Sequence, residues 1–144
     1  QEILEAVQSY IEIAGPSAFE QLRLHYVNRI SLDPSKGNVD ISRLLEVWPR
    51  VPPRLGSSFG KFLVKIDLPE PTLGARLVVT AGIAENPSGD VAAALILDLD
   101  FISVASPLPL DAAAAWLEEA HRRIVDSFEL CITDEARLRF EPLI

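Results

Sequence analysis

The chain has 144 residues, 49% of them hydrophobic, and a formal net charge of −8 at pH 7. This length and apolar content suit one compact domain with its own core, and no apolar run reaches the roughly 20 residues that a membrane-spanning helix requires. The acidic balance argues against extended, sequence-independent binding to nucleic acid, because such binding needs a positive surface against the phosphates.

The N-terminal segment has the pattern of an amphipathic helix. Its apolar residues recur at helical spacing, at Ile3, Leu4, Val7, Tyr10 and Ile11. Gly15 and Pro16 end the pattern, since neither residue type continues a helix easily. Because the sequence begins without Met and contains none, we expect residues 1–144 to form a single domain that is a piece of a longer protein.

Residues 21–32 alternate between apolar and polar character. One side of the alternation holds Leu22, Leu24, Tyr26, Asn28, Ile30 and Leu32, with the asparagine as its one polar member. The other side holds Gln21, Arg23, His25, Val27, Arg29 and Ser31, with the valine as its one apolar member. A period of two predicts a strand with one face on a core and a basic face toward water or a partner.

A short helix and an irregular connector are expected next. Residues 33–38 have turn chemistry, and Asp40 suits the N-cap of a short helix that Pro49 would end. The apolar residues of this helix are Ile41, Leu44, Leu45 and Trp48. Residues 49–58 are rich in proline and predict a connector without regular structure.

Three further strands are expected at residues 62–68, 77–83 and 93–101, where apolar residues alternate with polar ones. Turns at 69–74 and 85–90 separate them. Turns of this length favour antiparallel neighbours, because a parallel crossover needs a dozen residues or more. We therefore predict a meander.

The longest helix is expected from Asp111 to Cys131. Its apolar stripe comprises Trp116, Leu117, Ala120, Ile124, Val125, Phe128 and Cys131. A stripe of this width predicts packing on a sheet. The fold class is therefore α+β: a two-layer domain in which an antiparallel sheet of about four strands carries the long C-terminal helix on one face. The other face is left for solvent or for something outside this segment.

Asp98 and Asp100 lie on one face of the last predicted strand. Paired carboxylates can hold Mg²⁺ or carry acid–base chemistry. The alternative is cross-strand ion pairing with Lys61, Lys65, Arg76 or Arg29 on the same face. Because no third ligand sits at a convincing spacing, we favour ion pairing and predict no metal site and no cofactor.

Two other residues stand out on the first strand. Asn28 occupies an inward position, where it either bonds to a neighbouring loop or bulge or lines a pocket between sheet and helix. His25 lies on the outward face, without a carboxylate or nucleophile near it in the sequence. The single cysteine cannot form an intrachain disulfide and fits a reducing, cytoplasmic location. No complete catalytic set is present, so we lean against an enzyme.

The stretch Leu24-His25-Tyr26-Val27-Asn28-Arg29-Ile30 resembles the signature of a sporadically distributed bacterial family of uncharacterised proteins, whose usual form is close to L-R-Y-x-N-R-I. The proline-rich stretch, the Leu97–Asp100 strand and the ending His121…Phe128…Ile132-Thr133 are also similar. The resemblance implies that this chain is the C-terminal part of a longer protein. This sequence departs from the family signature at His25, where arginine is usual.

Three functions remain open at this point. The first is a non-enzymatic protein-interaction module that uses the exposed sheet face, with its own N-terminal segment, another copy or a separate protein as partner. The second is a small-ligand module with a cavity between sheet and long helix. A metal-dependent hydrolase ranks third. The candidate binding residues are Arg23, His25, Tyr26, Asn28, Arg29, Asp98 and Asp100.

Overall fold

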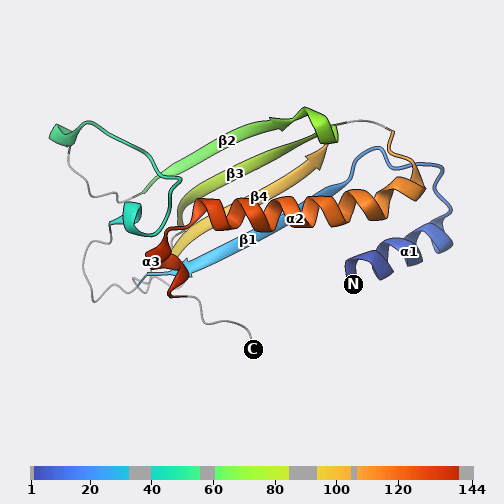
Figure 1. Cartoon of the computed structure of the whole chain (residues 1–144), viewed down its shortest axis with the longest axis horizontal. Helices are drawn as coiled ribbons and strands as arrows, with labels where there is room; N and C mark the ends of the chain where they lie inside the picture. The colour runs from blue at the N-terminus through green and yellow to red at the C-terminus, as the bar shows by residue number, and fades with distance from the viewer. Residues whose placement is uncertain (1, 33–39, 56–60, 85–93, 105–106, 140–144) are drawn as a thin grey trace.

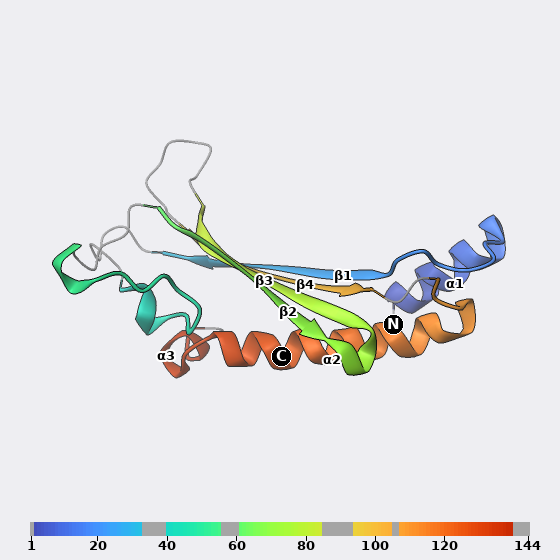
Figure 2. The ribbon, with the colours of Figure 1, turned by 90° about the horizontal axis from the view of Figure 1, so that it is seen from above.

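The computed structural model describes residues 2–32, 40–55, 61–84, 94–104 and 107–139. They form two layers, a sheet and a long helix across it (Figures 1 and 2). The α+β class, the antiparallel sheet and the long C-terminal helix are therefore confirmed. None of the described helices is both long enough and apolar enough to cross a membrane.

The sheet has four antiparallel strands in the order β1-β4-β3-β2. They are β1 (Arg23–Ser31), β2 (Leu63–Glu70), β3 (Ala75–Ala84) and β4 (Ala94–Ser103). The last three form the predicted meander, and β1 pairs with the edge of β4 that faces away from β3. The two outer positions in the sheet thus belong to β1 and β2.

Strand register assigns each side chain to one of two faces. The inner face, which is the one toward the long helix, carries Leu24, Tyr26, Asn28, Ile30, Leu95, Leu97, Leu99, Phe101, Leu77, Val79, Ala81, Ile83, Val64, Ile66 and Leu68. The outer face carries Arg23, His25, Val27, Arg29, Ile96, Asp98, Asp100, Ile102, Arg76, Val78, Thr80, Gly82, Leu63, Lys65 and Asp67. Tyr26 and Arg29 lie on opposite faces, as the alternation predicts.

The long helix α2 (Ala113–Cys131) packs over β1 and β4. Three residues of the helix are buried, namely Leu117, Ala120 and Ile124. Its Trp116 packs against Phe101 of β4, with ring centroids 5.6 Å apart. Val125, a predicted member of the stripe, is 41% exposed. The helix therefore covers the β1 and β4 side of the inner face and leaves the β2 side open.

The N-terminal helix α1 (Glu2–Ala14) packs at the end of the molecule where β1 begins. Its Leu4 and Val7 contact a small cluster around Leu22 and Leu117. The helix ends as predicted, because Gly15 takes a positive φ of 56° and donates its N–H to the Ile11 carbonyl.

The predicted short helix after Asp40 is wrong in extent. It is one 3₁₀ turn, Ile41–Arg43, capped as expected by Asp40, whose carboxylate accepts from the Ser42 N–H at 3.0 Å. Leu45 instead pairs with Ile132, and the Glu46 N–H donates to the Cys131 carbonyl. This long-range pairing extends the backbone where the apolar spacing had suggested a helix.

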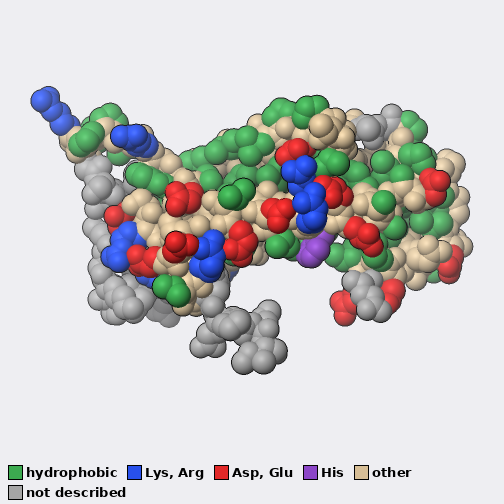
Figure 3. Space-filling view, viewed as in Figure 1, with side chains coloured by type: hydrophobic (Ala, Val, Ile, Leu, Met, Phe, Trp, Pro, Cys, Tyr) green, Lys and Arg blue, Asp and Glu red, His purple; other side chains and the backbone are tan. Residues whose placement is uncertain are grey.

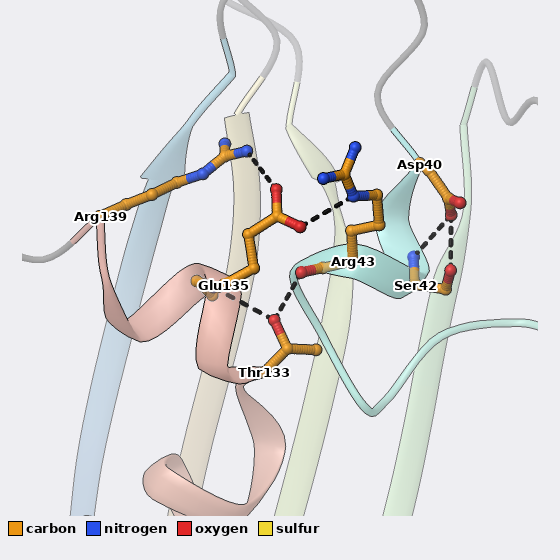
Figure 4. Close-up of polar contacts among 7 residues, drawn as sticks. Asp40, Ser42, Arg43, Thr133, Glu135 and Arg139 are labelled. Atoms are coloured by element: carbon orange, nitrogen blue, oxygen red, sulfur yellow. Dashed lines mark hydrogen bonds and ion pairs between the residues drawn. The ribbon is translucent and has the colours of Figure 1, made fainter.

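A polar clamp fastens the 3₁₀ turn to the short helix α3 (Asp134–Arg137), as Figure 4 shows. The Thr133 hydroxyl donates to the Arg43 carbonyl at 2.5 Å, and Arg43 pairs with Glu135 at 2.8 Å. The C-terminal segment is thereby fixed against the end of the core.

The predicted connector and turns differ from the structure in detail. Residues 53–55 form a 3₁₀ turn within the proline-rich connector. The turn at 69–74 is a strand end followed by the 3₁₀ turn Pro71–Leu73, closed by Gly74 at a φ of 53°. The predicted turns at 33–38 and 85–90, and the end of the connector, lie outside the described residues.

Candidate functional site

The outer face carries two side-chain pairs between β1 and β4, an Arg–Asp ion pair and a His–Asp hydrogen bond. Arg23 contacts Asp100 at two points, with Nε to Oδ1 at 2.6 Å and Nη2 to Oδ2 at 2.5 Å. His25 Nε2 lies 2.6 Å from Asp98 Oδ1. Both pairs run diagonally, since the register sets His25 opposite Asp100. Cross-strand pairing of the two aspartates is confirmed, and four of the predicted site residues are brought together.

The partners differ from those that the sequence predicted. Asp98 and Asp100 bind His25 and Arg23 on β1, whereas Arg76 on β3 pairs with Asp67 at 2.8 Å. A carboxylate that already accepts from a cation has fewer lone pairs left for Mg²⁺. Within the described ranges, no group of three or more His, Cys, Asp or Glu side chains is arranged to hold a metal ion.

Asp100 is the most enclosed charge of the outer face, with only 6% of its surface exposed. The hydrogen bond and the charge of Asp100 raise the pKa of Arg23 above its ordinary value. A buried carboxylate needs such a partner, because an unpaired charge in this position is costly. The Arg23–Asp100 pair therefore stabilises the β1–β4 interface and also shapes the outer face.

An exposed apolar side chain lies beside these pairs. Val27 is 58% exposed, next to Arg29, which is also exposed and forms no ion pair with another described residue. No described helix or strand crosses the outer face (Figure 2). The outer face thus combines the paired aspartates with the exposed Val27 and Arg29, whereas its Val78 and Ile102 are buried.

A second candidate lies on the inner face, at the junction of α1, β1 and α2. The Tyr26 hydroxyl is 2.7 Å from His121 Nδ1, and the two rings are 5.8 Å apart between centroids. An open pocket of about 160 Å³ surrounds this contact. Its lining comprises Ile3, Leu4, Leu24, Tyr26, Leu117, Glu118 and His121.

Asn28 lies two residues further along the same face of β1. Its amide donates to the Leu97 carbonyl at 3.2 Å, so this inward polar group is satisfied by the neighbouring strand. The predicted partner, a loop or bulge, is wrong, because the acceptor lies on the paired strand β4. The ligand hypothesis placed Tyr26 and Asn28 in the wall of a pocket. Tyr26 lines the pocket and Asn28 does not, and the other polar lining residues, Glu118 and His121, come from α2.

Sequence reasoning missed His121 as the partner of Tyr26 and Glu118 as a lining residue of the same pocket. The usable signal was their place on the helix: His121 follows the buried Leu117 by four residues, which sets both on neighbouring positions of one face. The buried Cys131 ends the same helix, and burial raises the pKa of its thiol, which disfavours the thiolate that binds metals.

No protein-family model matches this chain, and a search of curated proteins finds no relative.

Proposed function

We propose that this chain is a non-enzymatic protein-interaction module whose outer sheet face docks a second protein surface. One observation carries it: no described helix or strand covers the outer face, which combines the exposed Val27, the Arg23–Asp100 ion pair and the exposed cation of Arg29. A sheet with one face on a core and the other bare can bury the bare face against another layer.

The paired charges make docking less costly than a set of lone charges would. Removing an isolated ion from water is expensive, whereas Arg23 and Asp100 already hold each other at two points. Val27 supplies exposed apolar area, and Arg29 supplies a cation that a carboxylate or a carbonyl of the partner could accept. Arginine is also a residue type that often dominates interface energetics.

The partner is a protein segment, either the part of a longer chain that precedes residue 1 or a separate protein. The stretch Leu24–Ile30, which resembles the signature of a bacterial family, falls on β1 and includes Arg29, whereas the signature leaves position 27 unspecified. We propose membership of that family and, on the single buried cysteine, a cytoplasmic location.

Photo-cross-linking tests the docking surface. A benzophenone amino acid replaces Val27 on the outer face or, as the control, Leu130, which is 77% exposed on α2. In an extract of the source cells, the residue-27 probe is expected to give one discrete adduct that Arg29→Glu removes. No adduct from residue 27, or the same adduct from both positions, would contradict the proposal.

The pocket beside Tyr26 favours a second candidate function, the binding of a small ligand. A volume of about 160 Å³ is close to that of a cavity that holds one benzene ring. Its apolar lining suits a hydrocarbon group, and Glu118 suits an ammonium head. We expect benzylamine to raise the melting temperature of the chain and benzoate to leave it unchanged. An equal response to benzylamine in Glu118→Gln would remove this candidate.

A further inference from the structure

Strand β2 exposes hydrophobic side chains on both of its faces. Leu63 on the outer face is 75% exposed, and Ile66 and Leu68 on the inner face are 37% and 44% exposed. Figure 3 shows hydrophobic side chains gathered along β2, beside α2. Among the described elements, β2 has a strand neighbour on one side only, namely β3. An exposed apolar edge of this kind is a template for pairing with another strand.

The backbone of β2 has a definite orientation at this edge. The Ile83 N–H donates to the Phe62 carbonyl, so the polar backbone groups of Phe62 point toward β3. Because these directions alternate along a strand, the odd-numbered residues 63, 65, 67 and 69 direct their backbone groups to the free edge. Pro69, which has no N–H, is in the odd-numbered set, where proline is tolerated in an edge strand.

The side chains along this edge are self-complementary. Lys65 and Asp67 lie on the outer face, with opposite charges and a spacing of two residues. Val64, Ile66 and Leu68 alternate with them on the inner face. A strand with this pattern can face an antiparallel copy of itself without placing like charges together.

We propose that β2 pairs with β2 of a second copy of this chain, antiparallel and centred on Ile66. In this register Lys65 of each copy lies opposite Asp67 of the other on the outer face, and both residues direct backbone groups across the new edge. On the inner face Ile66 meets its own counterpart, and Leu68 meets Val64 of the other copy. Lys65 and Asp67 thus gain partners of opposite charge, and Val64, Ile66 and Leu68 are covered in the same register.

Neighbouring registers are unfavourable. A shift that centres the pairing on Lys65 sets lysine against lysine, and a shift to Asp67 sets aspartate against aspartate. Like charges directly opposite each other destabilise a strand pair. A shift by a single residue would exchange the inner and outer faces. The charge pattern therefore selects the Ile66-centred register.

Asp67 can serve both its own chain and the second copy. Its Oδ2 already accepts from Arg76 at 2.8 Å, and Asp67 remains 49% exposed. A carboxylate offers about four acceptor positions, so Oδ1 can accept from Lys65 of the other copy. The paired chains form one continuous eight-stranded sheet with both α2 helices on the same face, which leaves the outer face open for the partner proposed above.

The oligomeric state tests this pairing. Sedimentation of the wild-type chain over a range of concentrations is expected to show a monomer–dimer equilibrium. Lys65→Glu makes the edge wholly acidic and Asp67→Lys makes it wholly basic, and each is expected to weaken self-association by about tenfold or more. A mixture of the two variants is expected to form a heterodimer. In that mixed pair the introduced glutamate of one variant lies opposite the introduced lysine of the other, and the native Asp67 of the first lies opposite the native Lys65 of the second.

Arg139→Glu, a charge reversal at an exposed position of the C-terminal segment, is the control and is expected to leave self-association unchanged. Circular dichroism confirms that each variant is folded. A wild-type chain that stays monomeric, a dimer that survives both charge reversals, or a mixture that fails to associate would each overturn the pairing. The docking surface around Val27 is tested separately by cross-linking, so the two proposals can fail independently.

Discussion

Arg23 and Asp100 join the edge strand β1 to the central strand β4 through two contacts between one guanidinium and one carboxylate. The carboxylate is buried, whereas the guanidinium side chain is about half exposed. Such an arrangement anchors β1 and presents a preformed ion pair on the outer face. It is the best-defined polar feature of the surface that we propose as a docking site.

Loss of this pair is expected to destabilise the chain more than loss of an exposed helical pair. Arg23→Gln leaves the Asp100 carboxylate buried with a weaker partner, whereas Arg122→Gln frees carboxylates that solvent reaches. Urea unfolding at pH 7 checks the order of the two effects. Replacing Asp100 by Asn in the Arg23→Gln background is expected to recover part of the loss, and equal effects of the two arginine variants would contradict the assignment.

Stability is expected to depend on pH through Glu119 of α2. The hydrogen bond from Arg122, assisted by Arg123, lowers the pKa of Glu119 below its ordinary value of 4.5. The folded state therefore favours the carboxylate, and this stabilisation is present above pH 4.5 and is lost as the pH falls through the lowered pKa. Melting temperatures of wild type and Glu119→Gln should differ at pH 7 and converge in acid. A constant difference across that range would be inconsistent with the ion pair.

The adjacent helix residues Ile124 and Val125 offer a direct test of which side of α2 packs on the sheet. Ile124 is completely buried, and its replacement by Ala is expected to lower the free energy of unfolding by about 2–5 kcal/mol. Val125 is 41% exposed, and its replacement by Ala is expected to change that free energy by no more than about 0.5 kcal/mol. Denaturant titration measures both, and a reversed order would mean that α2 is rotated on the sheet.

Gly82 permits the close approach of β2 to β3. A Cβ atom at this position would lie 2.9 Å from the Phe62 carbonyl oxygen, which is backbone and cannot turn away. Gly82→Ala is therefore expected to destabilise the chain by about 1–3 kcal/mol. Thr80→Ala, on the same face of β3, serves as the control and is expected to cost less than about 1 kcal/mol. A neutral Gly82→Ala would show that the two strands lie further apart.

The layers and the two faces of the sheet were predictable from local patterns. Alternation in residues 21–32 placed Tyr26 inward and Arg29 outward, because side-chain direction depends only on strand periodicity. The lengths of the turns predicted the meander, and the apolar stripe of residues 111–131 predicted the long helix. All these signals act between residues that are close in the sequence.

The partners across the structure were not predictable in the same way. Whether Asp100 meets Arg23 or Arg29 depends on the register of β1 on β4, which no local pattern specifies. The contact of Tyr26 with His121 joins residues 95 positions apart. The predicted helix after Asp40, of which only the 3₁₀ turn Ile41–Arg43 forms, was wrong in extent for a similar cause, since the pairing of Leu45 with Ile132 overrides the local spacing.

The most direct test of the outer face as a docking surface is a binding measurement between this chain and the protein that cross-links at residue 27. That protein is expressed separately from this chain. Its dissociation constant is measured for wild type, Arg29→Glu and the control Arg139→Glu, which reverses an exposed charge on the far C-terminal segment. We predict a rise of about tenfold or more for Arg29→Glu, equivalent to about 1.4 kcal/mol, and no change for Arg139→Glu. Unchanged affinity in Arg29→Glu would contradict the account.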